Sequence, residues 1–169
     1  MIKKHLKTFG SITIATTLLL GCSSKSALSV FGEDSLYERG LEYTKVADII
    51  NSLETKAIVN VTYLNSSHSS KWDNKNENFL VGIYIVNDNE EDEKKFINNE
   101  KYHLTLNNKN MTSYSELTSK NDLWGHIPIK NPHAKYYIVS FDKYKSPSTL
   151  SMKYKHTTFG AVTLSFPSE

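Results

Sequence analysis

From residue 57 to the end of the chain, apolar side chains recur at every second position, and this period of two constrains the fold most strongly. Successive side chains of a β-strand point to opposite faces, so the alternation predicts strands with one buried face. The segments that show it are residues 59–63, 79–86, 104–106, 137–141, 150–154 and 162–166. Residues 79–86 are almost continuously apolar, which predicts a central strand covered on both faces.

Clusters of Asn, Ser, Gly and Pro separate these segments. They lie at residues 65–78, 87–99, 107–113, 131–132 and 145–148. Short alternating strands between turn-forming clusters are typical of an antiparallel sandwich. No helical pattern falls between the strands, and a parallel sheet needs such crossovers. We therefore expect one antiparallel β-sandwich domain over residues 55–169.

A different period precedes the strands. Ser35 and Glu38 fit a capping box, in which the two side chains satisfy amide groups at the start of a helix. Apolar residues then recur at spacings of three and four, at Leu36, Tyr43, Val46, Ala47, Ile50 and Leu53. The pattern predicts an amphipathic helix over residues 35–54, which Gly40 weakens by up to about 1 kcal/mol relative to Ala.

The N-terminal segment has the organisation of a secretory signal. Lys3, Lys4 and Lys7 precede an apolar run at residues 12–20, and Gly21 and Cys22 follow. The run is shorter than the roughly 20 residues that cross a bilayer. A positive start, an apolar run and small residues predict a signal peptide over residues 1–21. Residues 22–34 are rich in Ser and predict a flexible tether.

Leu19-Leu20-Gly21-Cys22 resembles the lipobox of bacterial lipoproteins. The resemblance implies cleavage before Cys22, lipidation of Cys22 and attachment to a membrane, which two or more acyl chains make stable. Ser23 stands where many inner-membrane lipoproteins have Asp, so the resemblance points to the outer membrane of a bacterial envelope. The alternative is an ordinary secreted protein with an unmodified cysteine near its cleavage site.

Cleavage before Cys22 leaves 148 residues, with 17 basic and 18 acidic side chains and a formal net charge of −1. Arg39 is the only arginine, so the usual readers of phosphates and bases are nearly absent. No glycine-rich phosphate loop occurs. We expect neither a nucleic-acid nor a nucleotide partner.

Motifs for catalysis and metal binding are also missing. Five histidines follow the signal, none in the spacing that places two metal ligands on one helical face: His68, His103, His126, His133 and His156. No Gly-x-Ser-x-Gly elbow is present. The acidic segment 88–93 lacks the Gly of a calcium loop, which favours a solvated connection and leaves weak cation binding as the alternative. We predict no enzyme activity, no metal site and no cofactor.

Two groups of residues carry a resemblance to immunoglobulin-like domains. The loop at Pro132 leads into Tyr137-x-Val139-x-Phe141, which resembles the tyrosine-bearing strand near the end of such domains. Tyr43-Thr44-Lys45 and Thr62-Tyr63-Leu64-Asn65 resemble small lipoproteins of the Campylobacter group, one branch of which has a variant of that fold. The Cys…Trp…Cys signature of antibody domains is absent. The resemblance implies a mainly β, immunoglobulin-like sandwich of about seven strands after one N-terminal helix.

These expectations favour a recognition role. The loop at residues 65–78 carries His68 and Trp72 among Ser and Asn, the composition of a binding loop. The alternative interpretation is that Trp72 folds back over a sheet edge. Independently of this, Trp124 is expected in the core. We expect an outer-membrane lipoprotein that acts as a non-catalytic binding or adhesion module for a protein or host-surface partner. The alternatives are a structural subunit of an envelope or secretion assembly and a hydrolase with dispersed catalytic residues.

Overall fold

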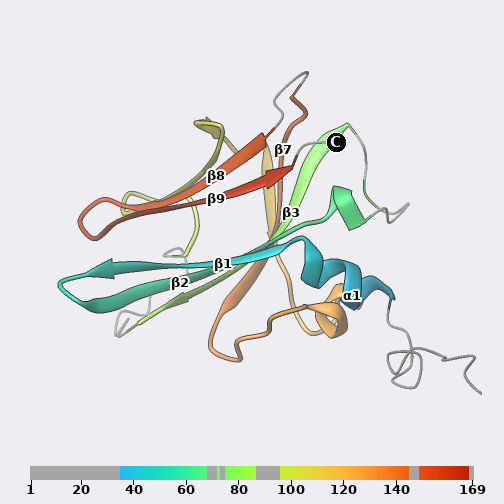
Figure 1. The fold of residues 1–169 in the computed structure, drawn as a ribbon, viewed down its shortest axis with the longest axis horizontal. Coiled ribbons are helices and arrows are strands. Elements are labelled where there is room, and N and C mark those ends of the chain that lie inside the picture. The colour runs from blue at the N-terminus through green and yellow to red at the C-terminus, as the bar shows by residue number, and fades with distance from the viewer. Residues whose placement is uncertain (1–34, 68–71, 73–74, 87–95, 145–148, 168–169) are drawn as a thin grey trace, which may run out of the picture. The chain divides into compact units, whose positions relative to one another are not determined.

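The computed structural model describes residues 35–67, 72, 75–86, 96–144 and 149–167, all within one unit of the chain, Asp34–Glu169. The described part begins with a short helix, α1 (Ser35–Glu42), and continues as strands (Figure 1). The strands are β1 (Thr44–Asn51), β2 (Glu54–Tyr63), β3 (Asn76–Ile85), β4 (Tyr102–Leu106), β5 (Lys109–Asn110), β6 (Ser113–Glu116), β7 (Lys135–Asp142), β8 (Thr149–His156) and β9 (Gly160–Pro167). Two 3₁₀ turns, η2 (Asn65–Ser67) and η3 (Asp122–His126), interrupt the loops. No helix of the described part is long and apolar enough to span a membrane.

The strands form two antiparallel sheets. Sheet A has the order β1-β2-β3-β7-β6, and sheet B has the order β5-β4-β8-β9. An immunoglobulin-like domain has the orders A-B-E-D and C′-C-F-G, and β2-β3-β7-β6 and β5-β4-β8-β9 match them in sequence. Strand β1 is an additional edge strand of sheet A. The expected antiparallel immunoglobulin-like sandwich is confirmed, with nine strands where about seven are expected.

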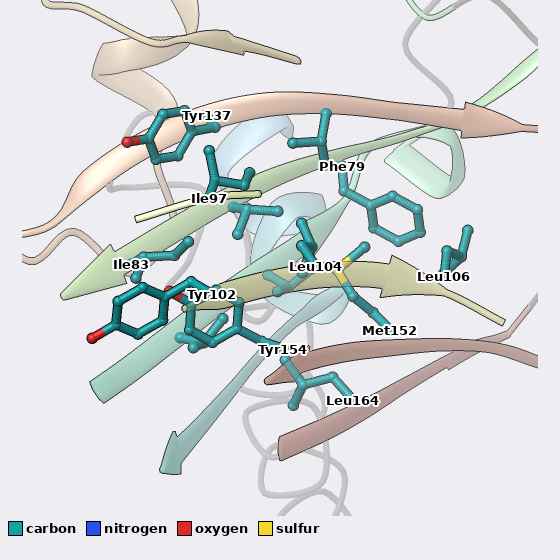
Figure 2. Packing of buried hydrophobic residues seen from close by; sticks show 14 of the residues in the cluster. Phe79, Ile83, Ile97, Tyr102, Leu104, Leu106, Tyr137, Met152, Tyr154 and Leu164 are labelled. Carbon is teal, nitrogen blue, oxygen red and sulfur yellow. The ribbon is translucent and has the colours of Figure 1, made fainter. Parts of the chain in front are cut away.

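The main core fills the space between the sheets. Alternate residues of β3, β7, β8 and β9 point into it, as the period of two predicts: Phe79 and Val81 are fully buried, and so are Val139 and Leu150. Figure 2 shows Tyr102 of β4 beside Tyr154 of β8, with Leu104 and Met152 on the same two strands. The rings of Tyr102 and Tyr154 are stacked, with centroids 5.7 Å apart.

A second cluster covers the outer face of sheet A, on the side away from sheet B. We call it the outer cluster; its buried members are Leu64, Leu80, Leu117, Ile127 and Tyr136. It lies under the segment between β6 and β7, which includes η3. Strand β3 is therefore covered on both faces, as predicted from its continuous apolar run.

The helix expected over residues 35–54 is wrong beyond its first two turns. It ends at Glu42, and after Tyr43 the chain forms β1, Thr44–Asn51, which pairs antiparallel with β2. The Thr44 hydroxyl donates a hydrogen bond of 2.6 Å to the Gly40 carbonyl, at the point where the chain leaves the helix. Ile49, which lies outside the predicted helical stripe, is the buried residue of β1, at 2% exposure. Pairing with β2 therefore overrides a spacing that fits a helix equally well.

The tyrosine-bearing strand also has a different position from the one that the resemblance implies. Residues 137–141 lie in β7, which corresponds to strand E, whereas the tyrosine of immunoglobulin domains belongs to strand F. Tyr137 points into the main core (Figure 2). Its neighbour Tyr136 makes the bond back to the preceding loop: its hydroxyl accepts the amide of Asn131 at 2.6 Å.

Candidate functional site

Three positions from the sequence analysis, Cys22, His68 and the acidic segment 88–93, lie outside the described residues. The structure describes Trp72 and the four later histidines. The candidate surfaces that it does describe are the outer cluster, the hairpin of β8 and β9, and the outer face of sheet B.

Trp72 lies against the outer cluster. Its side chain is half-buried, and its indole Nε1 is buried without a hydrogen-bond partner in the described part of the chain. Asn65, at the start of the same connection, accepts the Asn78 amide at 2.8 Å and donates to the Asn76 carbonyl at 2.7 Å. These contacts tie the connection to the beginning of β3. Trp72 therefore helps to cover the outer face of sheet A, whereas the alternative interpretation placed it over a sheet edge. Its role in a binding loop stays a prediction.

Trp124 is at the rim of the outer cluster rather than in the main core. Its ring meets that of Tyr136 edge to face, with centroids 5.9 Å apart. The Lys130 ammonium lies 4.1 Å from the centroid of the Trp124 ring. Burial raises the pKa of the Tyr136 hydroxyl, whose bond to Asn131 acts in the opposite direction. The three side chains fix the loop before β7 on the sheet.

A small pocket opens beside the outer cluster. Leu64, Leu80, Leu123 and His126 line it, together with Gly40 of α1. It holds about 20 Å³, which is room for one water molecule, whereas small-molecule sites usually span roughly 300–1,000 Å³. His133 is placed elsewhere, beside the ring of Tyr84 at 6.1 Å. The pocket is therefore no substrate site.

His156 has a structural position at the end of β8. Its Nδ1 accepts the backbone amides of Thr158 and Phe159, each at 3.0 Å, and its ring stacks on Phe159 at 4.3 Å. Burial lowers the pKa of the imidazole, and the positive charge of Lys101 lowers it further. A neutral ring with the proton on Nε2 fits these contacts, because Nδ1 acts as an acceptor.

Buried polar groups of the main core also bind one another or the backbone. Glu77, at 2% exposure, accepts a hydrogen bond of 2.5 Å from the Tyr63 hydroxyl. The Tyr154 hydroxyl donates to the Phe96 carbonyl at 2.7 Å, and burial raises its pKa well above the usual range. Within the described ranges, no group of three His, Cys, Asp or Glu side chains could hold a metal ion. These titratable groups hold the sandwich together.

The outer face of sheet B is a further candidate surface, which the sequence alone does not predict. Two cross-strand rows form its centre: His103, Lys155 and Ala161 in one, and Thr105, Lys153 and Thr163 in the other. The two lysines and the two β9 residues are exposed, and the two β4 residues are half-buried. The four strands of this sheet contain no Asp or Glu. The absence of acidic residues from these four strands can be seen in the sequence, but only after the strands have been assigned to their sheets.

Comparison with protein-family models, with curated proteins and with solved structures gives no match.

Proposed function

We propose that the protein is a lipoprotein of the bacterial outer membrane, attached through lipid on Cys22, and that its sandwich is a non-catalytic binding or adhesion module. The signal-like N-terminal segment and the lipobox-like Leu19-Leu20-Gly21-Cys22 support the anchor. The tether at residues 22–34 would then separate the sandwich from the membrane surface.

One structural observation carries the binding role: the two outer faces of the sandwich differ. The outer face of sheet A is covered by the outer cluster, whereas the lysine-bearing face of sheet B has exposed side chains in β5, β8 and β9 and half-buried ones in β4. Buried groups with acid–base chemistry, such as Glu77 and His156, are used within the fold. A rigid scaffold with one uncovered sheet face is suited to recognition, and loops or faces on such a scaffold commonly carry it.

The anchor is tested by metabolic labelling with radioactive palmitate in a bacterial host. We expect label on the unaltered protein, loss of label in Cys22→Ala, and retention in the neighbouring control Ser23→Ala. Fractionation of the envelope should place the unaltered protein with outer membranes and release Cys22→Ala from them. Equal labelling of the unaltered protein and Cys22→Ala would overturn the anchor.

A structural subunit of an envelope or secretion assembly is the second candidate, and the β1–β2 hairpin favours it. Ile50 is 62% exposed and Leu53, at the tip, is fully exposed. Exposed apolar side chains close together are typical of protein interfaces. If this candidate is correct, Leu53→Ser should reduce the size of the detergent-extracted complex in sedimentation, and an unchanged size would count against it.

A further inference from the structure

We propose that the outer face of sheet B binds an anionic polysaccharide. This face, which we call the lysine face, presents the polar residues His103, Thr105, Ser151, Lys153, Lys155, Thr163 and Ser165 around Ala161. The inference names the partner chemistry of the proposed binding module and rests on that proposed function.

Acidic side chains are divided unevenly between the two sheets. All acidic residues of the strands lie in sheet A: Asp48, Glu54, Glu77, Glu116 and Asp142. The strands of sheet B contain three lysines and no acidic residue. Although the mature chain would be nearly neutral, the lysine face is therefore positive. A surface of one sign attracts a partner of the opposite sign.

The positive charges on the lysine face are exposed. Lys153 and Lys155 are exposed, and neither forms an ion pair with a described carboxylate. They follow one another on the same face of β8, about 7 Å apart along the strand. Thr149 and Ser151 continue the same line, so that it extends over roughly 20 Å. A linear polymer with repeated negative charges can contact such a line at several points.

Hydroxyl groups lie beside the two lysines. The hydroxyls of Thr105, Ser151, Thr163 and Ser165 flank them in the cross-strand rows. A hydroxyl can both donate and accept a hydrogen bond, which suits the hydroxyls of a sugar chain. The exposed large apolar residues of the described part all lie outside sheet B. Protein interfaces are usually centred on Trp, Tyr or Arg, and this face presents none of them, so a glycan fits better than an acidic protein.

The test compares three polymers of matched length with the full-length protein in detergent micelles, by isothermal titration calorimetry at low ionic strength. Oligogalacturonate carries carboxylates on a sugar chain, oligoglutamate carries carboxylates on a peptide chain, and dextran carries sugar without charge. We expect saturable binding of oligogalacturonate, weaker binding of oligoglutamate and no binding of dextran. Added salt should weaken the binding, because exposed ionic contacts are screened.

The variant Lys153→Gln/Lys155→Gln should lower the affinity for oligogalacturonate about tenfold, the loss expected for two exposed ionic contacts. The matched control, Lys120→Gln/Lys143→Gln, removes the same charge from two exposed positions outside sheet B and should change the affinity by less than twofold. Equal losses in both variants would show that net charge alone is sensed and would overturn the proposal. Equal or stronger binding of oligoglutamate would overturn it in favour of an acidic protein partner.

Failure of the glycan test and failure of the proposed function are distinguishable. A protein that binds none of the polymers but carries palmitate on Cys22 would contradict this inference alone. An unaltered protein that carries no acyl group would contradict the anchor alone, because calorimetry tests the lysine face independently.

Discussion

A glycine in the middle of β3 shows how a single residue shapes the covered face of sheet A. Gly82 lies in one cross-strand row between Asn60 of β2 and Tyr136 of β7. The Tyr136 ring lies across the glycine, so close that a Cβ on Gly82 would be 2.4 Å from its Cε1 atom. The hydroxyl of the same tyrosine is held by Asn131. The ring is thus fixed at both ends, and β3 needs a residue without a side chain there.

Gly82→Ala should therefore lower the free energy of unfolding by about 2–3 kcal/mol, the cost of overpacking a rigid site. The measurement is urea denaturation followed by tryptophan fluorescence. Gly125→Ala is the control, because a Cβ on Gly125 meets no atom within 4 Å, and its effect should be small. Equal midpoints for Gly82→Ala and the unaltered protein would show that Tyr136 can move away.

His156 gives the protein a defined dependence of stability on pH. Its folded pKa is below the ordinary value of 6.5, so the unfolded chain binds more protons than the folded one. Its contribution to stability is complete above about pH 6.5 and is lost as the pH falls from there through the folded pKa. We expect the urea midpoint to fall between pH 7.5 and pH 5.

His156→Asn should flatten that dependence, since the Asn side chain can accept the amides of Thr158 and Phe159 without titrating. The quantity compared is the slope of the urea midpoint against pH, in the unaltered protein and in His156→Asn, and not the absolute stability of either. Parallel slopes for the two proteins would show that another group causes the pH effect.

Trp72 is expected to contribute by packing. Trp72→Ala should lower the melting temperature by several degrees, because it uncovers part of the outer cluster. Trp72→Phe should cost less, since the buried Nε1 makes no hydrogen bond in the described part. The melting temperatures of both variants are measured by calorimetry. An unchanged melting temperature for Trp72→Ala would contradict the packing role and favour the interpretation that Trp72 belongs to a binding loop.

At the scale of elements, the sequence predicts the strands that have one clearly buried face. Leu150, Met152 and Tyr154 alternate in β8 and are buried there, as expected. Strand β1 is missed because Val46, Ala47 and Ile50 fit a helical spacing, and the strand is selected by pairing with β2, whose partner residues lie 3–18 positions further along the chain. Strands β5 and β6 are missed because all their residues are exposed and show no alternation of apolar residues. Hydrogen bonds to their neighbours define them.

The turn between β1 and β2 is strained in a way that can be measured. Ser52 and Leu53 have φ angles of 51° and 64°, the left-handed region that a type I′ turn requires and that Gly or Asn favours. Leu53→Gly should therefore raise the free energy of unfolding by about 0.5–1 kcal/mol. Leu53→Ala, which keeps the strain, should change stability little, because Leu53 is fully exposed. A lower urea midpoint for Leu53→Gly would show that its side chain is used in the fold.

At the scale of the whole molecule, the pattern of strands predicts the sandwich but not its surfaces. Lys153 and Lys155 are ordinary exposed residues in the sequence, and His103 is one of several isolated histidines. His103 lies beside the two lysines only because β4 and β8 are neighbours in sheet B, although about fifty residues separate these two strands in the sequence. Likewise, the outer cluster joins Leu80 to Leu117 and Ile127 through the fold. Such long-range pairings are set by tertiary structure, and no local pattern encodes them.

The proposed attachment of this sandwich to a membrane through lipid on Cys22 can be tested by mass spectrometry of the purified mature protein. We expect a chain that begins at Cys22 and whose N-terminal peptide carries the added mass of a diacylglycerol group. The proposed attachment would be contradicted by a mature chain with a different first residue, or by a Cys22 thiol that reacts with iodoacetamide and carries no acyl group.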